Sequence, residues 1–272
     1  MSSFYPQADE YADVEGPQIT VEKLPWDRFR ERFARRFHQG DYVSIFGGPN
    51  AGKTHLAVLV AEHRALSFFL ALKPRDTLIG RLASRGWTIS SSLEAMNQLV
   101  ERKRERDGVT VKEEWPLYPR YVYWPLAVPS MDFTLDQIAD IKSRAAEESM
   151  VLLLNHGSWA VVWDEANYMA DTLRLRRQMS EFWYSARSNL VSVIACAQRP
   201  AYIPRVAYTS PHHLFIFQAT EREDQKRLAE IVGGMEWQAL AAAIGSLNWR
   251  GHEFLYVAPH DRTAFISACP PW

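Results

Sequence analysis

The sequence predicts an α/β fold in which a mostly parallel sheet carries helices on both faces. Three observations lead to this prediction. A glycine-rich loop at residues 47–54 lies between a strand-like and a helix-like stretch. Further apolar runs alternate with amphipathic segments along the chain, as they do in βαβ units. The run at residues 158–163 is almost wholly apolar, which is typical of a central strand in a parallel sheet.

The individual elements follow from local patterns. Phe29, Phe33 and Phe37 repeat every four residues, so we expect a helix there with one aromatic stripe. Thr134 is a suitable N-cap for a helix whose apolar face includes Ile138. In chain order we expect strands at residues 41–46, 65–72, 121–126, 158–163, 191–197 and 213–217, and helices at residues 25–38, 55–63, 91–106, 134–149, 172–189 and 221–232.

The length of 272 residues is enough for one large α/β domain. Residues 1–18 are polar and show no periodicity, so we expect them to form a flexible N-terminal arm. We expect a core at residues 19–232 with an insert around residues 87–124. We expect residues 233–272 to form a C-terminal appendage packed on that core.

The composition is that of a globular chain, with 47% hydrophobic and 23% charged residues. A net charge of −1 provides no global basic field for nucleic acid, so any such contact must come from local patches. No apolar run approaches the about 20 residues of a membrane span. Cys196 and Cys269 form no metal or redox motif. We therefore expect a reduced, cytoplasmic protein (in the host cytoplasm if the chain is viral) without membrane contact.

The glycine-rich loop carries the strongest chemical signal. It matches the pattern G-x-x-x-x-G-K-[ST] of phosphate-binding P-loops, in which backbone N–H groups and a helix N-terminus hold phosphates. Lys53 would reach the β- and γ-phosphates of ATP, and Thr54 would offer its hydroxyl to Mg²⁺. The alternative is a glycine-rich turn without a ligand. The residues of the loop are Gly47, Gly48, Pro49, Asn50, Ala51, Gly52, Lys53 and Thr54.

Two carboxylates end the apolar run at residues 158–163. Asp164 and Glu165 follow it directly, as in a Walker B motif, in which the aspartate holds the Mg²⁺ shell. Glu165 would then polarise a water molecule for in-line attack on the γ-phosphate. The alternative is a pair of surface carboxylates that stabilise the start of the next helix.

A polar residue also ends the next expected strand. Gln198 follows residues 191–197, and at that position it could sense the γ-phosphate from between the P-loop strand and the Walker B strand. The alternative is a turn made by Pro200.

These motifs resemble those of the FtsK/HerA-type ATPases. Residues 185–200 end in Gln198-Arg199-Pro200 and are similar to a segment of that family that ends in the same Gln-Arg-Pro signature. Residues 73–76 are similar to a lysine-containing turn of the group. The resemblance implies a RecA-like core of the additional-strand, catalytic-glutamate class, and a ring that moves double-stranded DNA. The short chain looks more like a viral or phage DNA-packaging ATPase than a chromosome pump.

Ring motors complete each site with an arginine from the neighbouring subunit. The resemblance suggests Arg187 for this role, with Arg199 as the second choice, while a solvated or salt-bridged surface arginine is the alternative for each. It also implies a homo-oligomeric ring, a pentamer or hexamer, with a portal or capsid protein as a candidate partner. Basic segments at residues 28–36, 102–106 and 174–177 are candidates for phosphate contacts with duplex DNA, although basic faces are usually solvated surface.

The sequence therefore predicts an ATP- and Mg²⁺-dependent ring motor that translocates double-stranded DNA, with genome packaging as its favoured task. Two alternatives remain. One is a nucleotide-gated switch that hydrolyses ATP slowly, and the other is a loader ATPase that acts on a protein or on single-stranded nucleic acid.

Overall fold

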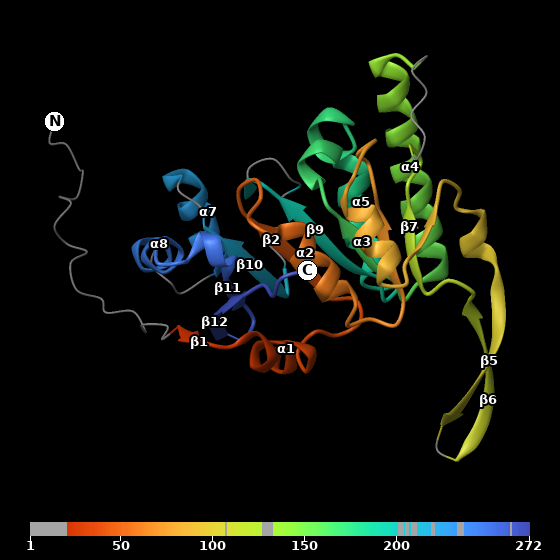
Figure 1. Cartoon of the computed structure of the whole chain (residues 1–272), viewed down its shortest axis with the longest axis horizontal. Coiled ribbons are helices and arrows are strands. Elements are labelled where there is room, and N and C mark those ends of the chain that lie inside the picture. Colours follow the sequence, from red (N-terminus) through yellow and green to blue (C-terminus); the bar gives the residue numbers. More distant parts are fainter. Residues whose placement is uncertain are drawn as a thin grey trace, which may run out of the picture.

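A central sheet organises the described part of the chain, and Figure 1 shows it with helices on both sides. The computed structural model describes residues 21–106, 108–126, 133–200, 204, 207, 211–218, 221–232, 237–261 and 263–272. The expected arm at residues 1–18 lies outside this described part. The strands of the sheet are β1 (Glu22–Lys23), β2 (Tyr42–Phe46), β3 (Ser67–Leu70), β4 (Thr88–Ser90), β7 (Arg120–Tyr123), β8 (Ala160–Trp163), β9 (Ser192–Ala197), β10 (His213–Phe217), β11 (Glu253–Ala258) and β12 (Thr263–Ala268).

The strand order is β1-β12-β11-β10-β2-β9-β8-β3-β7-β4. From β10 to β4 every neighbouring pair is parallel, whereas β11 is antiparallel to both of its neighbours. The carboxyl ends of parallel strands lie at the same edge of the sheet. In open α/β sheets, ligands bind at that edge.

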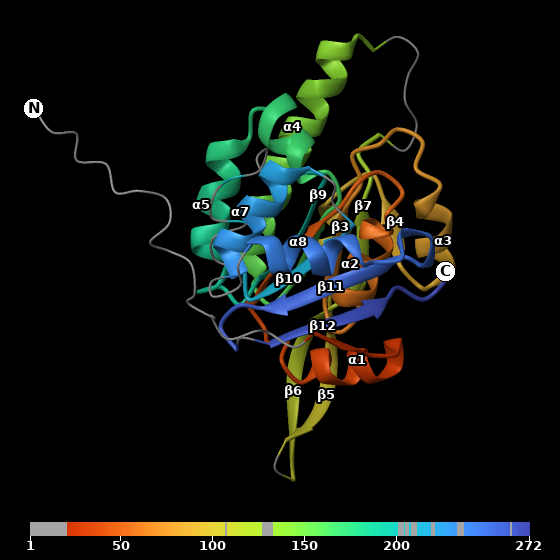
Figure 2. The same ribbon diagram turned by 90° about the vertical axis from the view of Figure 1, so that its left-hand side faces the viewer.

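Helices cover both faces of the sheet, as Figures 1 and 2 show from two sides. One face packs against α1 (Trp26–Ala34), α2 (Lys53–Ala61) and α3 (Leu78–Ser84). The other face packs against α4 (Leu135–His156), α5 (Arg176–Ala186), α7 (Arg222–Val232) and α8 (Trp237–Gly245). Shorter helical turns lie at Glu94–Asn97, Tyr168–Thr172 and Trp249–Gly251. The predicted α/β fold class is confirmed.

The strand β2 illustrates how the sheet is buried on both faces. Val43 and Ile45 pack into the core on the side of α1 and α2, and Tyr42 and Phe46 pack into the core on the opposite side. Successive side chains of a strand point to opposite faces. Burial on both faces explains why this strand is apolar at nearly every position.

The predicted aromatic stripe and the predicted N-cap are both confirmed. Phe29 and Phe33 on α1 are buried, and so is Phe37 just beyond its end. The Phe29 ring lies 5.2 Å from the ring of Tyr256 on β11, in an edge-on arrangement that aromatic pairs favour. Thr134 accepts a hydrogen bond from the backbone N–H of Gln137 and so forms a capping box at the start of α4.

The expected helix at residues 91–106 is wrong. A β-hairpin of β5 (Leu99–Arg106) and β6 (Val109–Pro116) takes its place and projects away from the sheet in Figures 1 and 2. The sequence Asp107-Gly108 between the strands is a strong hairpin signal, and Gly108 has φ +76°. Across the hairpin, Arg104 of the basic segment pairs with Glu113 at 4.0 Å, so this arginine finds its partner on the opposite strand rather than along a helix.

The C-terminal residues contribute directly to the sheet. Residues 233–272 were expected to pack on the core as an appendage, and within them β11 and β12 pair with each other and extend the sheet beyond β10. This position brings the end of the chain close to the P-loop helix α2. Among the described residues, we find no helix with the length and apolar character needed to span a bilayer.

Candidate active site

The P-loop connects β2 to α2 at the carboxyl edge of the sheet, and two of its glycines are needed for steric reasons. A Cβ atom on Gly47 would lie 2.6 Å from the Cβ of Phe217, closer than van der Waals contact allows. Gly52 caps α2 with φ +105°, a conformation that side chains other than hydrogen disfavour. The loop therefore runs against β10 and turns sharply into the helix.

Lys53 folds back over the loop. Its Nζ donates a hydrogen bond to the carbonyl oxygen of Gly48 at 2.8 Å. Burial lowers the pKa of Lys53, and the nearby carboxylates of Asp164 and Glu165 offset part of that effect. A phosphate bound in the loop would supply further negative charge and favour the ammonium form.

Thr54 and Asp164 bring two oxygen ligands together from different elements. The Thr54 hydroxyl, in the first turn of α2, donates a hydrogen bond to Oδ1 of Asp164 at the end of β8. A hydroxyl and a carboxylate are the hard oxygen donors that Mg²⁺ prefers. The residues present therefore fit a magnesium ion, which would bind between Thr54, Asp164 and the phosphates.

Lys73 reaches the same carboxylates from the loop after β3, the strand next to β8. Its Nζ lies 3.0 Å from Oδ2 of Asp164 and 2.8 Å from Oε1 of Glu165. Burial disfavours the charge on Lys73, but the two carboxylates outweigh burial and raise its pKa. The ammonium group thus neutralises the acidic pair directly beside the P-loop.

Gln198 and Cys196 come from β9, which lies between β2 and β8 in the sheet. Gln198 is exposed and lines the pocket just after the strand ends. Cys196 is buried, and burial raises the pKa of its thiol well above the ordinary value. Its Sγ lies 3.7 Å from the carbonyl oxygen of Lys53, so the thiol packs under the P-loop as a neutral group.

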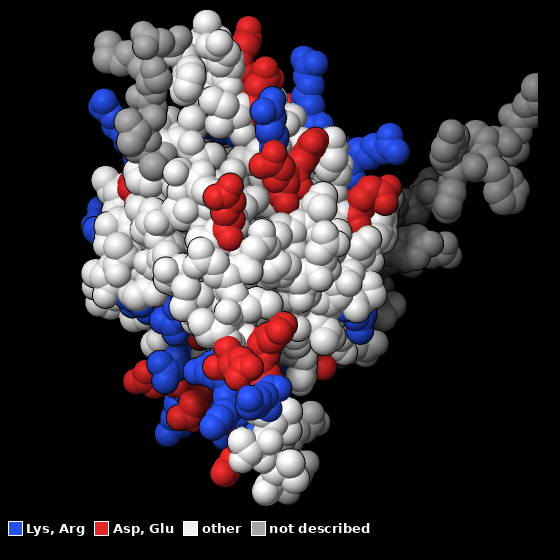
Figure 3. Space-filling model, turned by 90° about the vertical axis from the view of Figure 1, so that its right-hand side faces the viewer, with Lys and Arg blue, Asp and Glu red and all other residues white. Residues whose placement is uncertain are grey.

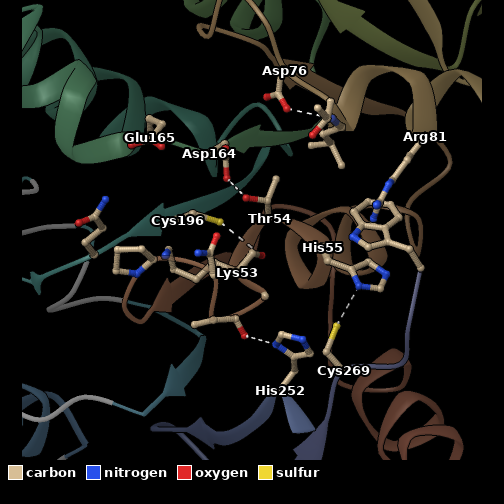
Figure 4. Close-up of a pocket in the computed structure, with 18 of the residues that line it drawn as sticks. Lys53, Thr54, His55, Asp76, Arg81, Asp164, Glu165, Cys196, His252 and Cys269 are labelled. Carbon is tan, nitrogen blue, oxygen red and sulfur yellow. Dashed lines mark hydrogen bonds between the residues drawn. The ribbon is translucent and has the colours of Figure 1, made fainter. Parts of the chain in front are cut away.

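A pocket of about 820 Å³ connects these groups, within the size range of small-molecule sites. Figure 4 shows Asp164 and Glu165 on one side of Lys53 and Thr54. The residues of the pocket that the sequence also singled out are Pro49, Asn50, Ala51, Gly52, Lys53, Thr54, Asp164, Glu165 and Gln198. Gly47 and Gly48 shape the loop just before them.

The sequence did not predict the residues that line the pocket on the side away from Asp164 and Glu165. His55, Arg81, His252 and Trp272 line that part of the pocket, and Nδ1 of His252 lies 3.0 Å from the carbonyl oxygen of Ala51. No local motif marks these residues. They reach the P-loop because α3 packs beside α2, and because β11 and β12 extend the sheet on the P-loop side.

The two candidate arginines for a trans contact lie elsewhere. The backbone N–H of Arg187 donates to the Tyr42 hydroxyl at 3.1 Å. Arg187 also packs against Gly40, before the start of β2, whereas the P-loop follows the end of that strand. Arg199 forms ion pairs with Asp224 at 2.9 Å and Glu221 at 2.5 Å within its own chain. Neither arginine is among the described residues that line the pocket.

The basic segments carry acidic neighbours. On α1, Arg32 pairs with Glu22 at 2.8 Å, and at the start of α5, Arg176 pairs with Asp171 at 2.5 Å. Figure 3 shows one face of the molecule, where lysine and arginine side chains gather at the lower end and are mixed with aspartate and glutamate. The described residues of that face therefore form no uniformly basic surface.

Comparison with known proteins identifies the fold. No family model matches the sequence, and no curated protein matches it. Among solved structures, the genome packaging NTPase B204 from Sulfolobus turreted icosahedral virus 2 in complex with AMP superimposes with a TM-score of 0.54 at 15% identity, over 87% of this chain and 100% of that chain. The same NTPase in complex with ATP-gammaS gives a TM-score of 0.52 at 14% identity, over 83% of this chain and 95% of that one. This chain therefore has the fold of a P-loop NTPase.

Proposed function

We propose that this chain is an ATPase that assembles as a ring and translocates double-stranded DNA, with genome packaging as its task. One observation carries the proposal. A P-loop lysine and threonine, an aspartate-glutamate pair and Gln198 come from separate parts of the sequence and surround one pocket. These side chains would supply the phosphate contacts, the metal ligands and the base of an ATP-hydrolysing site, and they support the proposal.

Binding uses the loop and its helix. Backbone N–H groups between Gly48 and Thr54 would surround the β- and γ-phosphates, and the N-terminus of α2 would favour their negative charge. Lys53 would leave the Gly48 carbonyl and contact the phosphates. Thr54 and Asp164 would hold Mg²⁺, which supplies charge neutralisation at the phosphates.

Hydrolysis requires a base on the γ-phosphate side of the pocket. Glu165 would accept a proton from the attacking water, whose oxygen bonds to the γ-phosphorus as the bond to the β–γ bridging oxygen breaks. ADP and phosphate are the products. The carboxylate of Glu165 is paired with Lys73, so this pair must loosen for Glu165 to reach the water. Gln198 would sense whether the γ-phosphate is present.

A ring provides the remaining cation. Arg187 lies at the edge of the sheet away from its own P-loop, so it could serve only the site of a neighbouring subunit. Arg199 is already paired with Asp224 and Glu221, which makes Arg187 the first candidate for the contact in trans. An arginine of this kind stabilises the charge on the transferring phosphoryl group.

Two observations support DNA as the polymer that the ring would move: a structurally similar protein and the local basic segments. The structural relative B204 is a genome packaging NTPase by name. A translocase needs contacts to phosphates rather than to base edges. Residues 28–36, 102–106 and 174–177 supply arginines and lysines at three surface positions, and assembly into a ring could gather several copies of such segments around one duplex.

One observation favours an alternative. The ion pairs of Lys73 with Asp164 and Glu165 occupy both carboxylates, and such an arrangement favours slow turnover in the isolated chain. A nucleotide-gated switch, or a loader acting on a protein or on single-stranded nucleic acid, would use the same site in this restrained form.

Steady-state ATP hydrolysis tests the proposal. We expect linear duplex DNA to stimulate turnover by about tenfold or more, and Lys53→Ala and Glu165→Gln to abolish the stimulated rate. Single-stranded DNA of the same length is the control polymer. A turnover rate that does not change with duplex DNA would contradict the proposed translocase. A larger stimulation by single-stranded DNA would favour the loader ATPase.

A further inference from the structure

We propose that Trp272, supported by His55 and overlaid by Arg81, forms the subsite that binds the nucleobase of the nucleotide. The inference rests on the proposed nucleotide binding at the P-loop and adds the part of the site that the P-loop motifs do not specify. It assigns a binding role to the C-terminal segment at residues 269–272, which follows β12 and returns to α2.

The position of the subsite follows from the direction of the triphosphate. Asp164 and Glu165 define the side of the pocket where the γ-phosphate must lie, because they would hold the metal and the attacking water. Figure 4 shows His55, Arg81 and Cys269 on the opposite side of Lys53 and Thr54. A nucleotide whose phosphates lie in the loop must therefore extend its base toward His55 and Arg81.

Neighbouring side chains at the start of α2 face the two ends of the expected ligand. Thr54 and His55 are successive residues of α2, and successive side chains on an α-helix are about 100° apart around its axis. The Thr54 side chain is directed at Asp164, and the His55 side chain is directed at Trp272. One helical turn thus presents a metal ligand to the γ-phosphate end and an aromatic support to the base end.

His55 supports the Trp272 ring from one face. The imidazole of His55 stacks on the Trp272 ring with centroids 3.9 Å apart and planes within 15°. On its other side, Nδ1 of His55 lies 3.5 Å from Sγ of Cys269.

Trp272 and Arg81 leave surface for a ligand. Trp272 is 41% exposed although His55 covers one of its faces. The Arg81 guanidinium lies over the Trp272 ring, 5.5 Å from its centroid, and among the described residues it makes no ion pair. A planar base that stacks on the indole face away from His55 must displace the Arg81 guanidinium from that ring. The guanidinium can then stack on the outer face of the base, and both contacts are known from nucleic-acid recognition.

The chemistry of this subsite defines its specificity. Stacking on an aromatic face and a guanidinium depends on the π surface of the base and not on its hydrogen-bonding edge. The subsite should therefore accept nucleoside triphosphates that differ in their base. It should contribute to the affinity for nucleotides and not to the affinity for bare polyphosphate.

Calorimetric titration of the whole chain with two ligands separates these contributions. The ligands are the non-hydrolysable ATP analogue AMP-PNP and inorganic tripolyphosphate, each with MgCl₂. We expect Trp272→Ala to weaken AMP-PNP binding about tenfold, the loss of one stacked base, and to leave tripolyphosphate binding unchanged. Trp272→Phe should restore most of the loss. Tyr184→Ala, which removes a 73% exposed aromatic ring on α5, is the control and should change neither ligand.

Each contrary outcome has a distinct meaning. If Trp272→Ala weakens both ligands equally, the residue acts on the shape of the P-loop, and the base subsite is wrong. If it weakens neither, while Lys53→Ala weakens AMP-PNP binding, the P-loop site is correct and the base lies elsewhere. If the unaltered chain binds neither ligand, the proposed nucleotide binding and the subsite fall together.

Discussion

The ammonium group of Lys73 lies 2.8 Å from Oε1 of Glu165, the proposed catalytic base. The same ammonium lies 3.0 Å from Asp164, so one cation neutralises both carboxylates of the site. This arrangement gives the chain a resting state in which the base is occupied. Entry of Mg²⁺ and nucleotide would compete with Lys73 for Asp164 and so release Glu165.

Replacing Lys73 should therefore lower the stability of the ligand-free chain and increase the stabilisation that Mg²⁺ and nucleotide provide. In Lys73→Ala, the two carboxylates lose their cation and repel each other, which destabilises the chain in the presence of EDTA. Because Lys73 is about half exposed, solvent screening limits this loss. We expect a lower melting temperature than the unaltered chain in EDTA and a larger gain on adding Mg²⁺ and AMP-PNP, measured by calorimetry. Equal melting curves under both conditions would mean that Lys73 is only a surface lysine.

Lys53→Ala should weaken nucleotide binding without unfolding the chain. Its Nζ donates a hydrogen bond to the Gly48 carbonyl, and a phosphate bound in the loop would be its stronger partner. We expect ATP affinity to fall by about 10- to 100-fold, consistent with the loss of a charge-assisted contact, measured by titration calorimetry. Lys112→Ala, on the exposed hairpin, is the matched control, and an equal loss in that variant would point to general electrostatics.

Glu165→Gln should separate binding from chemistry. The amide keeps the shape of the side chain but cannot accept the proton of water, so turnover should fall by about 10²- to 10⁴-fold while AMP-PNP affinity stays within a few-fold. Single-turnover hydrolysis and calorimetry measure the two quantities. Asp171→Asn, outside the pocket, is the control. A variant that retains full turnover would remove Glu165 from its proposed role.

The P-loop glycines should differ in their tolerance of alanine. In Gly47→Ala, the new Cβ would lie 2.6 Å from Phe217, so β10 or the loop must shift at a cost of about 1–3 kcal/mol. At Gly48 a Cβ meets no atom of the described residues within 4 Å, so Gly48→Ala should change stability far less. Urea denaturation compares the two. Similar losses in both variants would show that steric contact with Phe217 does not govern the loop.

His55 should make stability depend on pH between about 4 and 6.5. Its folded-state pKa of about 4 lies below the ordinary value of 6.5 for histidine, so in this window the unfolded chain binds a proton that the folded chain does not. The stability from the neutral imidazole is therefore present above pH 6.5 and is lost as pH falls toward 4. The loss is on the order of 3 kcal/mol at most.

The pH dependence is read as a difference between variants, because other groups also titrate in this range. We expect urea denaturation to show a smaller loss between pH 6.5 and 4.5 for His55→Phe, which keeps the ring stack, than for the unaltered chain. Parallel stability curves would remove His55 as the cause.

Local sequence patterns were sufficient to predict the site residues that belong to a short motif. The P-loop and the carboxylates after β8 could be predicted because each is a short motif at the end of a buried strand. The hairpin at β5 and β6 was missed because its charged residues are paired across strands, a relation that helical periodicity does not contain. Trp272, His252 and Arg81 were missed because they reach the pocket through the order of strands and the packing of α3, which no local pattern encodes.

Displacement of a third strand from duplex DNA tests the central claim most directly. A triplex-forming oligonucleotide is placed at increasing distances from the duplex end, and its release is followed over time with ATP. We expect ATP-dependent release whose delay grows with that distance and which is absent in Glu165→Gln. Translocation would be contradicted if the chain hydrolyses ATP in the presence of duplex DNA but does not release the third strand. It would also be contradicted if the delay before release does not change with the distance from the duplex end.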